Sequence, residues 1–383
     1  MSGLPIYIDH HSTTPCDRRV VEAMLPYFGD DFGNPAAITH IHGRRAAQAL
    51  DESRRSIASF LHALPQEIFF TSGATEANNL VFGGVEIPGG AHVIISAVEH
   101  KSVQAPAARL SEKGIEVSIL GVDAEGFVSA DALGSAIRNE TMLVSVMAAN
   151  GEIGTVQPVQ DLARVCRERS ILFHTDATQA VGKIDCHVDQ MQCDLLSFSA
   201  HKFYGPKGVG GLFVRQGVRL SAQTLGGGQE SRLRSGTVNV PGVVGMARAL
   251  ELRAAEMAGE GERLTLMRNG LWDRIASEIG GSFVHGPRRL RLPGNLNVSF
   301  DGVDAESMIH ALRHFSLSSG SACSAADREV SSVLRAIGVS DELALASLRI
   351  GMGKANNSEE MDMLLADLKL VLPRLRELSA HTV

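Results

Sequence analysis

The chain has 383 residues, 44% of them hydrophobic, which predicts two or three structural units with sizeable cores. Its formal net charge of −7 argues against binding nucleic acid by neutralising phosphates. No apolar run has membrane-spanning length, and the N-terminus lacks the basic and apolar parts of a secretory signal. Five cysteines without a CxxC pair indicate reduced thiols. These properties predict a cytoplasmic α/β protein without membrane or nucleic-acid partners.

Short β-branched runs alternate with helix-like segments between about residues 66 and 215. The predicted strands are Glu67–Thr71, His92–Ala97, Glu116–Leu120, Leu143–Ala148, Leu172–Thr175, Leu195–Ser199 and Gly210–Val214. Apolar residues recur at helical spacing in Glu76–Phe82, Val103–Lys113, Asp131–Arg138 and Val159–Arg169. This alternation predicts a mainly parallel sheet with helices on both faces.

The pattern changes after about residue 241, where long amphipathic segments replace the alternation. They predict two helices, Val243–Leu266 and Asn269–Ile279, followed by short strands at Asn295–Phe300 and Ser347–Ile350. We therefore expect a large domain of residues 15–258. A smaller domain is expected to combine residues 1–14 with residues 259–383.

Polar residues directly follow several of the predicted strands: His100, Asn150, Asp176, Gln179 and Lys202. Ligands of parallel sheets collect beyond the carboxyl ends of the strands, so these side chains are candidates for one site. An acid after one strand and a lysine after another are what a pyridoxal phosphate (PLP) site requires. The lysine forms a Schiff base with the cofactor aldehyde, and the acid keeps the ring nitrogen protonated.

The segment from Thr71 to Thr75 contains Gly73 and lies between a predicted strand and a predicted helix. Free N–H groups and the positive end of the dipole at such a helix start suit a phosphate group. The alternative is that Ser72 or Thr75 simply caps the helix.

Cys323 lies among small and polar neighbours, Ser318-Ser319-Gly320-Ser321-Ala322 and Ser324-Ala325-Ala326-Asp327. Without apolar periodicity, this segment predicts a partly exposed loop from which a thiolate could attack a substrate. The alternative is a small buried hydrophobic residue. The remaining cysteines have no comparable setting and are predicted to be structural: Cys16, Cys166, Cys186 and Cys193.

Ten sequence blocks together resemble the cysteine desulfurases of the NifS/IscS type, a branch of the class V aminotransferase family. In chain order they are Tyr7-Ile8-Asp9 to Thr13-Thr14-Pro15, Thr71-Ser72-Gly73-Ala74-Thr75-Glu76, Glu99-His100-Lys101, Asn150-Gly151-Glu152-Ile153-Gly154, Asp176-Ala177-Thr178-Gln179, Ser199-Ala200-His201-Lys202, Gly226-Gly227-Gly228, Arg234-Ser235-Gly236-Thr237, Asn295-Leu296-Asn297 and Gly320-Ser321-Ala322-Cys323. The resemblance implies the α/β fold of type I PLP-dependent transferases. That fold has a large domain with a mainly parallel seven-stranded sheet, plus a smaller α+β domain. It also implies a homodimer that converts L-cysteine to L-alanine and passes sulfane sulfur to an acceptor protein for iron–sulfur cluster or thiolation pathways.

The same resemblance implies a role for each matching residue. Lys202 would bind the cofactor and move the substrate proton, His100 would stack on the ring and assist, and Cys323 would become a persulfide. The other implied cofactor contacts are Asp176 at the ring nitrogen, Gln179 and Asn150 near the ring hydroxyl, Ala74, Thr75, Ser199 and His201 at the phosphate, and Thr237 from a second subunit. The implied substrate contacts are Arg349, Asn150 and Asn34.

The chain departs from the family pattern at three places. His10-His11-Ser12 replaces the usual residues before Thr13-Thr14, Gly151 replaces a second asparagine, and Asn34-Pro35-Ala36-Ala37 lacks the usual serine. No resident metal is expected, because His10-His11, His40-x-His42 and Cys186 with Cys193 lack zinc-ligand spacing. A transient iron–sulfur cluster at Cys323 is left open. Other hypotheses are a selenocysteine lyase, another class V lyase or aminotransferase, and a non-catalytic sulfur-relay partner.

Overall fold

The structure is a computed structural model that describes residues 3–319 and 330–380. Residues 1–2, 320–329 and 381–383 lie outside this description. The predicted nucleophile Cys323 therefore lies outside the described residues.

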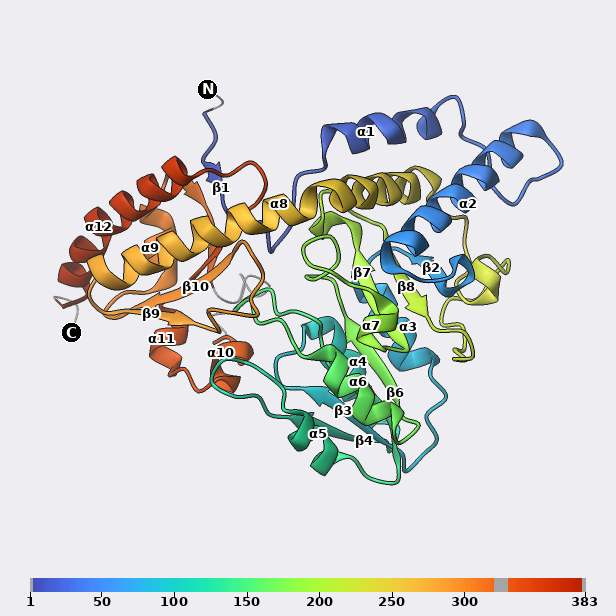
Figure 1. The fold of residues 1–383 in the computed structure, drawn as a ribbon, viewed down its shortest axis with the longest axis horizontal. Helices are drawn as coiled ribbons and strands as arrows, with labels where there is room; N and C mark the ends of the chain where they lie inside the picture. The colour runs from blue at the N-terminus through green and yellow to red at the C-terminus, as the bar shows by residue number, and fades with distance from the viewer. Residues whose placement is uncertain (1–2, 320–329, 381–383) are drawn as a thin grey trace.

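A seven-stranded sheet forms the centre of the larger part of the molecule (Figure 1). Its strands, in spatial order, are β2 (Ile68–Thr71), β8 (Gly210–Val214), β7 (Leu195–Ser199), β6 (Leu172–Asp176), β5 (Thr141–Ser145), β3 (His92–Ser96) and β4 (Glu116–Leu120). Only β8 runs antiparallel to its neighbours. All seven predicted strands are confirmed. The largest difference in bounds is at β5, which begins two residues before and ends three residues before the predicted strand.

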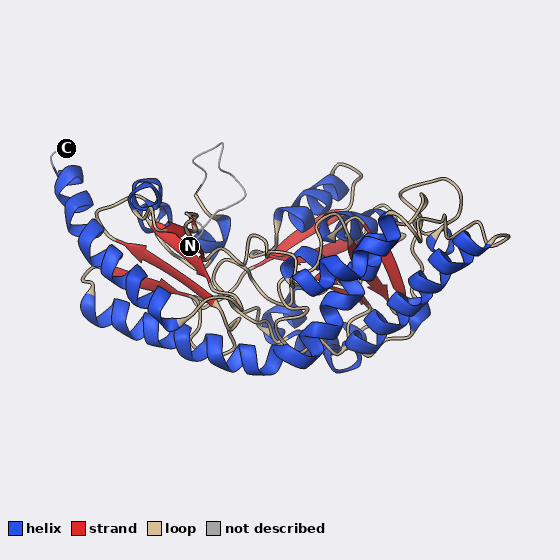
Figure 2. Cartoon of the chain, turned by 90° about the horizontal axis from the view of Figure 1, so that it is seen from above, coloured by secondary structure: helices blue, strands red, loops and turns tan. Residues whose placement is uncertain are grey.

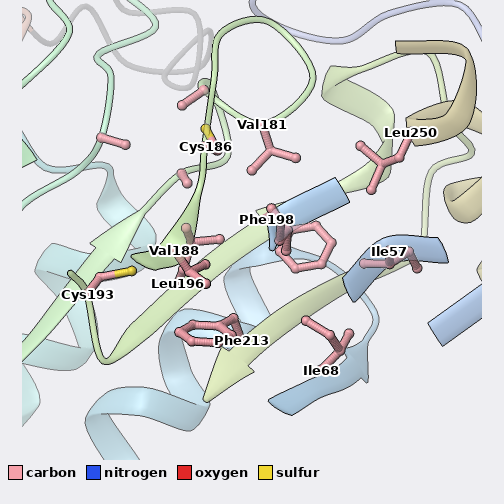
Figure 3. Close-up of a cluster of buried hydrophobic side chains, with 14 of the residues drawn as sticks. Ile57, Ile68, Val181, Cys186, Val188, Cys193, Leu196, Phe198, Phe213 and Leu250 are labelled. Atoms are coloured by element: carbon pink, nitrogen blue, oxygen red, sulfur yellow. The ribbon is translucent and has the colours of Figure 1, made fainter. Parts of the chain in front are cut away.

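Alternating residues of these strands enter two separate cores, one on each face of the sheet. In β3, Ile94 belongs to one cluster, while Val93 and Ile95 belong to the other. In β8, Phe213 belongs to the first cluster and Leu212 to the second. Figure 3 shows the first cluster, in which Phe213 lies near Phe198 and Ile68 of neighbouring strands and near helix residues. The two-residue period of a strand thus explains why helices cover both faces.

In the described part of the chain, four of the seven helices around this sheet match the predicted segments, whereas the helices at residues 18–24, 41–61 and 188–191 have no predicted counterpart. The seven helices are α1 (Arg18–Met24), α2 (Ile41–Leu61), α3 (Ala74–Gly84), α4 (Lys101–Ser111), α5 (Ala130–Ala136), α6 (Val159–Arg167) and α7 (Val188–Met191). In α6 the buried residues are Val159, Leu162, Ala163 and Cys166, at the spacing that keeps one helical face against the core. The Ser129 hydroxyl caps α5 by accepting from the N–H of Ala132.

A second, antiparallel sheet forms the centre of the smaller part. Its order is β12 (Ser318–Ser319), β13 (Ser347–Gly351), β10 (Asn295–Phe300) and β9 (Ser282–His285), and a short pair joins β1 (Ile6–Tyr7) to β11 (Phe315–Ser316). The helices of this part are α9 (Ala305–Ala311), α10 (Ser332–Ala336), α11 (Asp341–Leu345) and α12 (Ser358–Ala380). The core of this part gathers apolar residues of β10, β13, α9 and α12, and it also receives Ile8.

A single helix, α8 (Val240–Glu278), runs along both parts (Figure 2). The prediction of two helices divided near residue 268 is wrong. Arg268 and Leu271 are buried on either side of Asn269-Gly270, and this packing outweighs the cost of about 1 kcal/mol for a glycine in a helix. The N-terminal half of α8 packs on the first core, and Leu264, Leu271 and Ile275 pack on the second.

The predicted domain limits at residues 14/15 and 258/259 remain a prediction. The two separate cores support them, as does the place of Ile8 in the second core, although the 258/259 limit falls within α8. In the described ranges, no helix combines the length and apolar character needed to cross a membrane.

Leu296→Ala tests the second core, because Leu296 of β10 is fully buried there. We expect the free energy of unfolding to fall by about 3 kcal/mol through lost burial and the remaining cavity. Chemical denaturation measures this value. Leu266→Ala removes a side chain that is 74% exposed and should cost less than about 0.5 kcal/mol. Equal losses in both variants would contradict the assigned core.

Candidate active site

Two neighbouring parallel strands bring an acid and a lysine to the same edge of the large sheet. Asp176 is the last residue of β6, and Lys202 ends the 3-10 turn Ala200–Lys202 that follows β7. Strands β6 and β7 pair in parallel, with Asp176 opposite Ser197. The geometry thus confirms that both residues follow the carboxyl ends of adjacent strands.

The Asp176 carboxylate is buried and oriented by two neutral donors. Asn78 Nδ2 donates to Oδ2 at 2.9 Å, and the Thr178 N–H donates to Oδ1 at 2.9 Å. Because a buried carboxylate is most stable beside a cation, this arrangement fits the protonated ring nitrogen of PLP. Sequence reasoning did not identify Asn78, which lies inside α3 and carries no local signal of a site.

The segment from Asp9 to Thr14, which we call the N-terminal strap, holds the Lys202 turn. Lys202 Nζ donates to the carbonyl oxygens of His11 at 2.9 Å and Ser12 at 2.6 Å. The Thr14 N–H and hydroxyl both donate to the carbonyl of His201, and Thr14 Oγ1 accepts from the Tyr204 N–H. The lysine that would bind the cofactor is therefore positioned by a segment almost 190 residues earlier in the chain.

The start of α3 fits an anion such as the cofactor phosphate. Gly73 precedes the helix with φ of +154°, a conformation that favours glycine, and no side chain caps the helix. The alternative that Ser72 or Thr75 caps it is therefore wrong. A Cβ added to Gly73 would lie 3.5 Å from Ser199 Oγ, which places this hydroxyl beside the helix start. Thr75 is exposed there, and His201 Nδ1 lies 3.0 Å from Thr13 Oγ1.

Gln179 is bonded by His11, and Gly151 lies close beside it, so two of the three departures from the family pattern surround this residue. Its Nε2 donates to the carbonyl of His11 at 2.8 Å, while its Oε1 accepts from Lys183 Nζ at 2.6 Å and lies 3.2 Å from His11 Nδ1. A Cβ on Gly151 would lie 2.6 Å from Gln179 Nε2. The His10-His11 and Gly151 departures therefore act together around one predicted cofactor residue.

Lys183 lies fully buried in this network, and its position was not identified from the sequence. Burial, reinforced by the positive charges of Lys202 and Arg349, holds the pKa of Lys183 well below its usual value. Burial and Lys183 likewise lower the pKa of His11. A neutral amine can still donate to Gln179 Oε1, so the network keeps its hydrogen bonds without adding charge.

The side chain of Asn150 makes hydrogen bonds to backbone groups of its own and a neighbouring loop. Nδ2 donates to the Val98 carbonyl at 3.1 Å, and Oδ1 accepts from the N–H groups of Glu152 and Ile153. These bonds shape the turn that carries Gly151 beside Gln179. Direct contact of Asn150 with cofactor or substrate remains a prediction.

Arg349 in β13 lies where a substrate carboxylate could be bound. Its Nη2 donates to Asp9 Oδ1 at 2.8 Å, and Ser318 donates to the other oxygen of Asp9. Asn297 of β10 lies opposite Arg349. Within residues 3–319 and 330–380, Arg349 Nε and the Asn297 amide are buried without hydrogen-bond partners. Such groups are costly to bury, and a carboxylate ligand would accept from the two donors among them, Arg349 Nε and Asn297 Nδ2.

Two further predicted residues lie on the surface. The Asn34 side chain is exposed and accepts from the N–H of Ala36, and Thr237 is exposed in the turn before α8. The structure contains one chain, so the predicted contribution of Thr237 to a second subunit remains a prediction.

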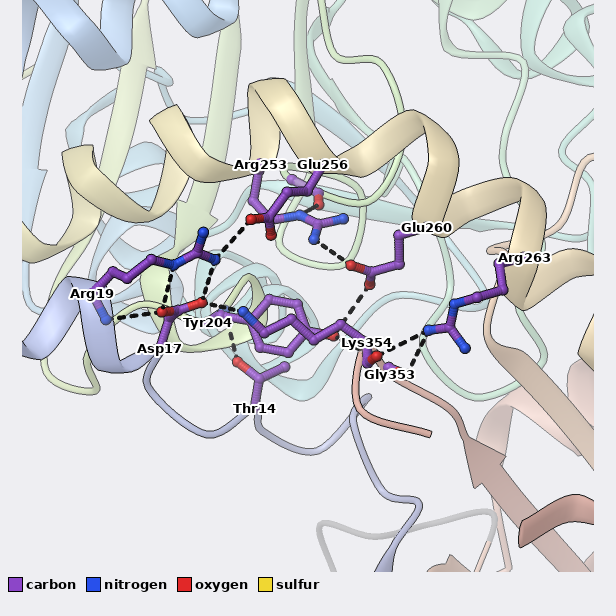
Figure 4. A network of polar contacts seen from close by, with 11 residues as sticks. Thr14, Asp17, Arg19, Tyr204, Arg253, Glu256, Glu260, Arg263, Gly353 and Lys354 are labelled. Carbon is purple, nitrogen blue, oxygen red and sulfur yellow. Dashed lines mark hydrogen bonds and ion pairs between the residues drawn. The ribbon is translucent and has the colours of Figure 1, made fainter. Parts of the chain in front are cut away.

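A polar network beside α8 connects the Lys202 turn to both parts of the molecule (Figure 4). The Tyr204 hydroxyl donates to Glu260 Oε1 at 3.2 Å and accepts from the Lys354 N–H at 2.8 Å. Lys354 Nζ pairs with Asp17, and Arg253 pairs with Glu260. Tyr204 therefore ties the turn to α8 and to the segment after β13.

Glu99 lies next to His100, is fully buried, and was identified only as part of a motif. Ser96 donates to its Oε1 at 2.6 Å, and the Met147 N–H donates at 2.7 Å. Burial, reinforced by the charge of Asp176, raises the pKa of Glu99 to about 8 against the opposing effect of these two bonds.

Glu99→Gln should change how stability depends on pH. Because the raised pKa lets the folded protein keep a proton that the unfolded chain releases, wild-type stability falls as pH rises from about 4.5 to about 8. The glutamine variant has no such group to titrate. Its free energy of unfolding, relative to that of the wild type, should therefore rise by up to about 1.4 kcal/mol for each pH unit in that window. Denaturation at several pH values measures the difference. The exposed variant Glu112→Gln should show a constant difference, and constancy in Glu99→Gln would contradict the assignment.

Comparisons with known proteins identify the family of the chain. Residues 6–364 match the family described as Aminotransferase class-V. Cysteine desulfurase IscS of Anaeromyxobacter sp. (strain Fw109-5) is 44% identical over 98% of this chain and 93% of that protein. Cysteine desulfurase IscS of Aeromonas salmonicida is 45% identical over 98% and 95%. A solved NifS-like protein has a TM-score of 0.91 and 36% identity, covering 97% of this chain and 100% of that chain. A structure described as SspA in complex with cysteine has a TM-score of 0.81 and 36% identity over 90% and 98%. The chain therefore belongs to the class V aminotransferase family, whose fold is that of type I PLP-dependent transferases.

Proposed function

We propose that this protein is a PLP-dependent cysteine desulfurase that converts L-cysteine to L-alanine. The observation that carries the proposal is the pairing of Asp176 and Lys202 at the ends of adjacent strands, beside an uncapped helix start. The cysteine desulfurases named IscS, which are about 44% identical over nearly the whole chain, support the reaction class. The SspA structure contains cysteine, which supports the substrate.

The residues of the site fit PLP and divide its parts among them. Lys202 would hold the aldehyde carbon, Asp176 the ring nitrogen and Gln179 the ring hydroxyl. The phosphate would lie at the start of α3, held by Ala74, Thr75, Ser199 and His201, with Thr237 from a second subunit. When bound, PLP withdraws electrons from the Cα of the amino acid and so weakens the bonds around it. Lys202 takes the Cα proton, because its amine is held by the N-terminal strap at the edge of the sheet.

Arg349 binds the substrate carboxylate in this proposal. Its Nη2 donates to Asp9. Its buried Nε has no hydrogen-bond acceptor among the described residues. Asn297 lies opposite it with its amide likewise unsatisfied. The Asp9 ion pair therefore orients the guanidinium for a bidentate contact with a carboxylate.

Cys323 would take the sulfur. Its thiolate attacks the substrate sulfur, a sulfur–sulfur bond forms, and the Cβ–S bond breaks with its electron pair left on the substrate carbon. Protonation of that carbon, return of a proton from Lys202 to Cα, and release of the amino group complete alanine. Ser318 pairs with Arg349 across β12 and β13. Cys323 lies five residues after Ser318 in the chain. A fully extended chain of that length spans up to about 17 Å, which allows the thiol to meet a substrate bound at Arg349.

We also propose a homodimer that delivers the sulfur to an acceptor protein for iron–sulfur cluster or thiolation pathways. Apolar side chains gather between the end of α1 and the start of α2, each more than half exposed: Leu25, Phe28, Phe32, Ile38 and Ile41. A group of this kind is typical of a subunit interface. The name IscS of the relatives supports the iron–sulfur route, and the cytoplasmic location remains a prediction.

Cys323→Ser tests the sulfur-transfer step. After brief exposure of the wild-type protein to L-cysteine without reductant, intact-mass measurement should show added sulfur that maps to Cys323, together with released alanine. The serine variant should show no added sulfur and should lose at least about 99% of alanine formation, because it lacks the attacking thiolate. Cys16→Ser, which removes a thiol in the first core, should behave as wild type. Equal alanine formation in wild type and Cys323→Ser would favour another class V lyase or an aminotransferase.

Arg349→Lys tests the carboxylate contact while keeping the positive charge beside Asp9. Loss of one charge-assisted bond of about 1.5–3 kcal/mol should raise KM for L-cysteine by about 10- to 100-fold, with a smaller effect on kcat. Steady-state alanine release measures both constants. Arg335→Lys alters an exposed ion pair with Asp341 and should leave them unchanged. An unchanged KM in Arg349→Lys would contradict the assigned role.

A further inference from the structure

The loop that leads to Thr237, residues 229–236, contains three consecutive residues in a backbone conformation that side chains rarely adopt. We call it the Glu230 loop. Glu230, Ser231 and Arg232 have φ of +47°, +55° and +69°. This left-handed region is costly for residues other than glycine. Strain of this kind is typical of functional sites, and contacts with the surrounding structure must maintain it.

A buried ion pair with Arg54 of α2 holds the Glu230 loop from outside. Arg54 Nη2 donates to Glu230 Oε1 at 2.7 Å, and Arg54 Nη1 donates to Oε2 at 3.0 Å. The side chains of Glu230 and Arg54 are 3% and 20% exposed, so salt screens this bidentate pair little. The Arg54 guanidinium also lies over the Phe70 ring, 4.3 Å from its centroid. These contacts fix the Glu230 carboxylate in both position and orientation.

The same pair satisfies the outer edge of β2 as a neighbouring strand would. Among the described strands, β2 pairs only with β8, so its other edge offers backbone groups. The Phe70 N–H donates to Glu230 Oε2 at 2.8 Å, and the Ile68 carbonyl accepts from Arg54 Nη1. Strand β2 leads into the start of α3, where the phosphate is expected. The Glu230 loop is therefore fixed to the rigid part of its own subunit.

A second ion pair holds the other end of the loop. Arg234 Nε donates to Glu76 Oε1 at 2.7 Å, and Glu76 lies in the first turn of α3. The Gly236 N–H donates to Gln229 Oε1 at 2.9 Å, which closes the loop on itself. Thr237 follows directly and is exposed. The loop thus presents Thr237 at the surface from a base that is held at both ends.

We propose that Arg54 and Glu230 are positioning residues for the cofactor site of a second subunit. They hold the Glu230 loop in its strained conformation, so that Thr237 reaches the phosphate at the start of α3 in the partner subunit. Neither residue of the ion pair touches the cofactor itself. This inference rests on the proposed function, which supplies the homodimer and the PLP phosphate, and it names the residues that join the two sites.

Glu230→Gln and Arg54→Lys test the ion pair in the holoenzyme. Glutamine keeps an oxygen for the Phe70 N–H, and lysine keeps the charge, but each variant loses the bidentate geometry. We expect the dissociation constant of PLP to rise about 3- to 10-fold in both, while kcat at saturating PLP stays within about twofold of wild type. Titration of cofactor-depleted protein with PLP measures this constant.

Asp273→Asn is the matched control for these variants, because it disrupts a bidentate pair with Arg288 in the smaller part. It should leave the dissociation constant of PLP unchanged. Wild-type affinity in both Glu230→Gln and Arg54→Lys would overturn the proposal.

Mixed dimers decide in which subunit the pair acts. One Glu230→Gln chain and one wild-type chain, with tags of different mass, are purified together and equilibrated with graded PLP. Borohydride then fixes the cofactor on Lys202, and intact mass shows which chain carries it. Because Thr237 crosses to the partner, the wild-type chain should lose affinity about 3- to 10-fold, while the variant chain keeps the affinity of the wild-type dimer. Loss in the variant chain, or equal loss in both, would show that the pair only stabilises its own subunit.

Cofactor loading is measured without turnover, so this inference and the proposed reaction can fail separately. Loss of affinity in the wild-type chain without alanine release from L-cysteine would contradict the desulfurase reaction alone. Normal alanine release with loss of affinity in the variant chain would overturn the positioning role alone.

Discussion

The N-terminal strap, residues 9 to 14, makes the hydrogen bonds on which the whole site depends. The His10 N–H donates to the Gly351 carbonyl in the smaller part, and the Thr14 N–H donates to His201 in the larger part. Between these points, the carbonyls of His11 and Ser12 hold the Lys202 amine. This short segment therefore contacts both the strand that carries Arg349 and the turn that carries the cofactor lysine. Arg349 and Lys202 otherwise belong to parts with separate cores, which α8 and the Tyr204 network also join.

Two buried acids lie near the cofactor site, and each accepts two hydrogen bonds from neutral donors. Glu99 receives two donors, but burial and the nearby Asp176 still raise its pKa to about 8, so it keeps its proton near neutral pH. Asp176 is left as the acid available to a cationic ring nitrogen.

The strands and the general position of the site could be predicted because their signals are local. Period-two alternation gave strands such as β3 and β8, and polar residues after β6 and β7 indicated the edge where Asp176 and Lys202 lie. Helix α8 could not be predicted as one element. Asn269-Gly270 is a local break signal, and only burial of Arg268 and Leu271 against the second core overrides it.

Residue types and their order along the chain determined the fold class, the family and the set of candidate residues. Only the tertiary structure decided which residues support them: Asn78 beneath Asp176, Lys183 and His11 around Gln179, and Asp9 beside Arg349. These partners lie from 4 to 340 positions away from the residues that they hold. The physical reason is that hydrogen bonds and burial depend on distance in space, whereas a sequence pattern records only distance along the chain.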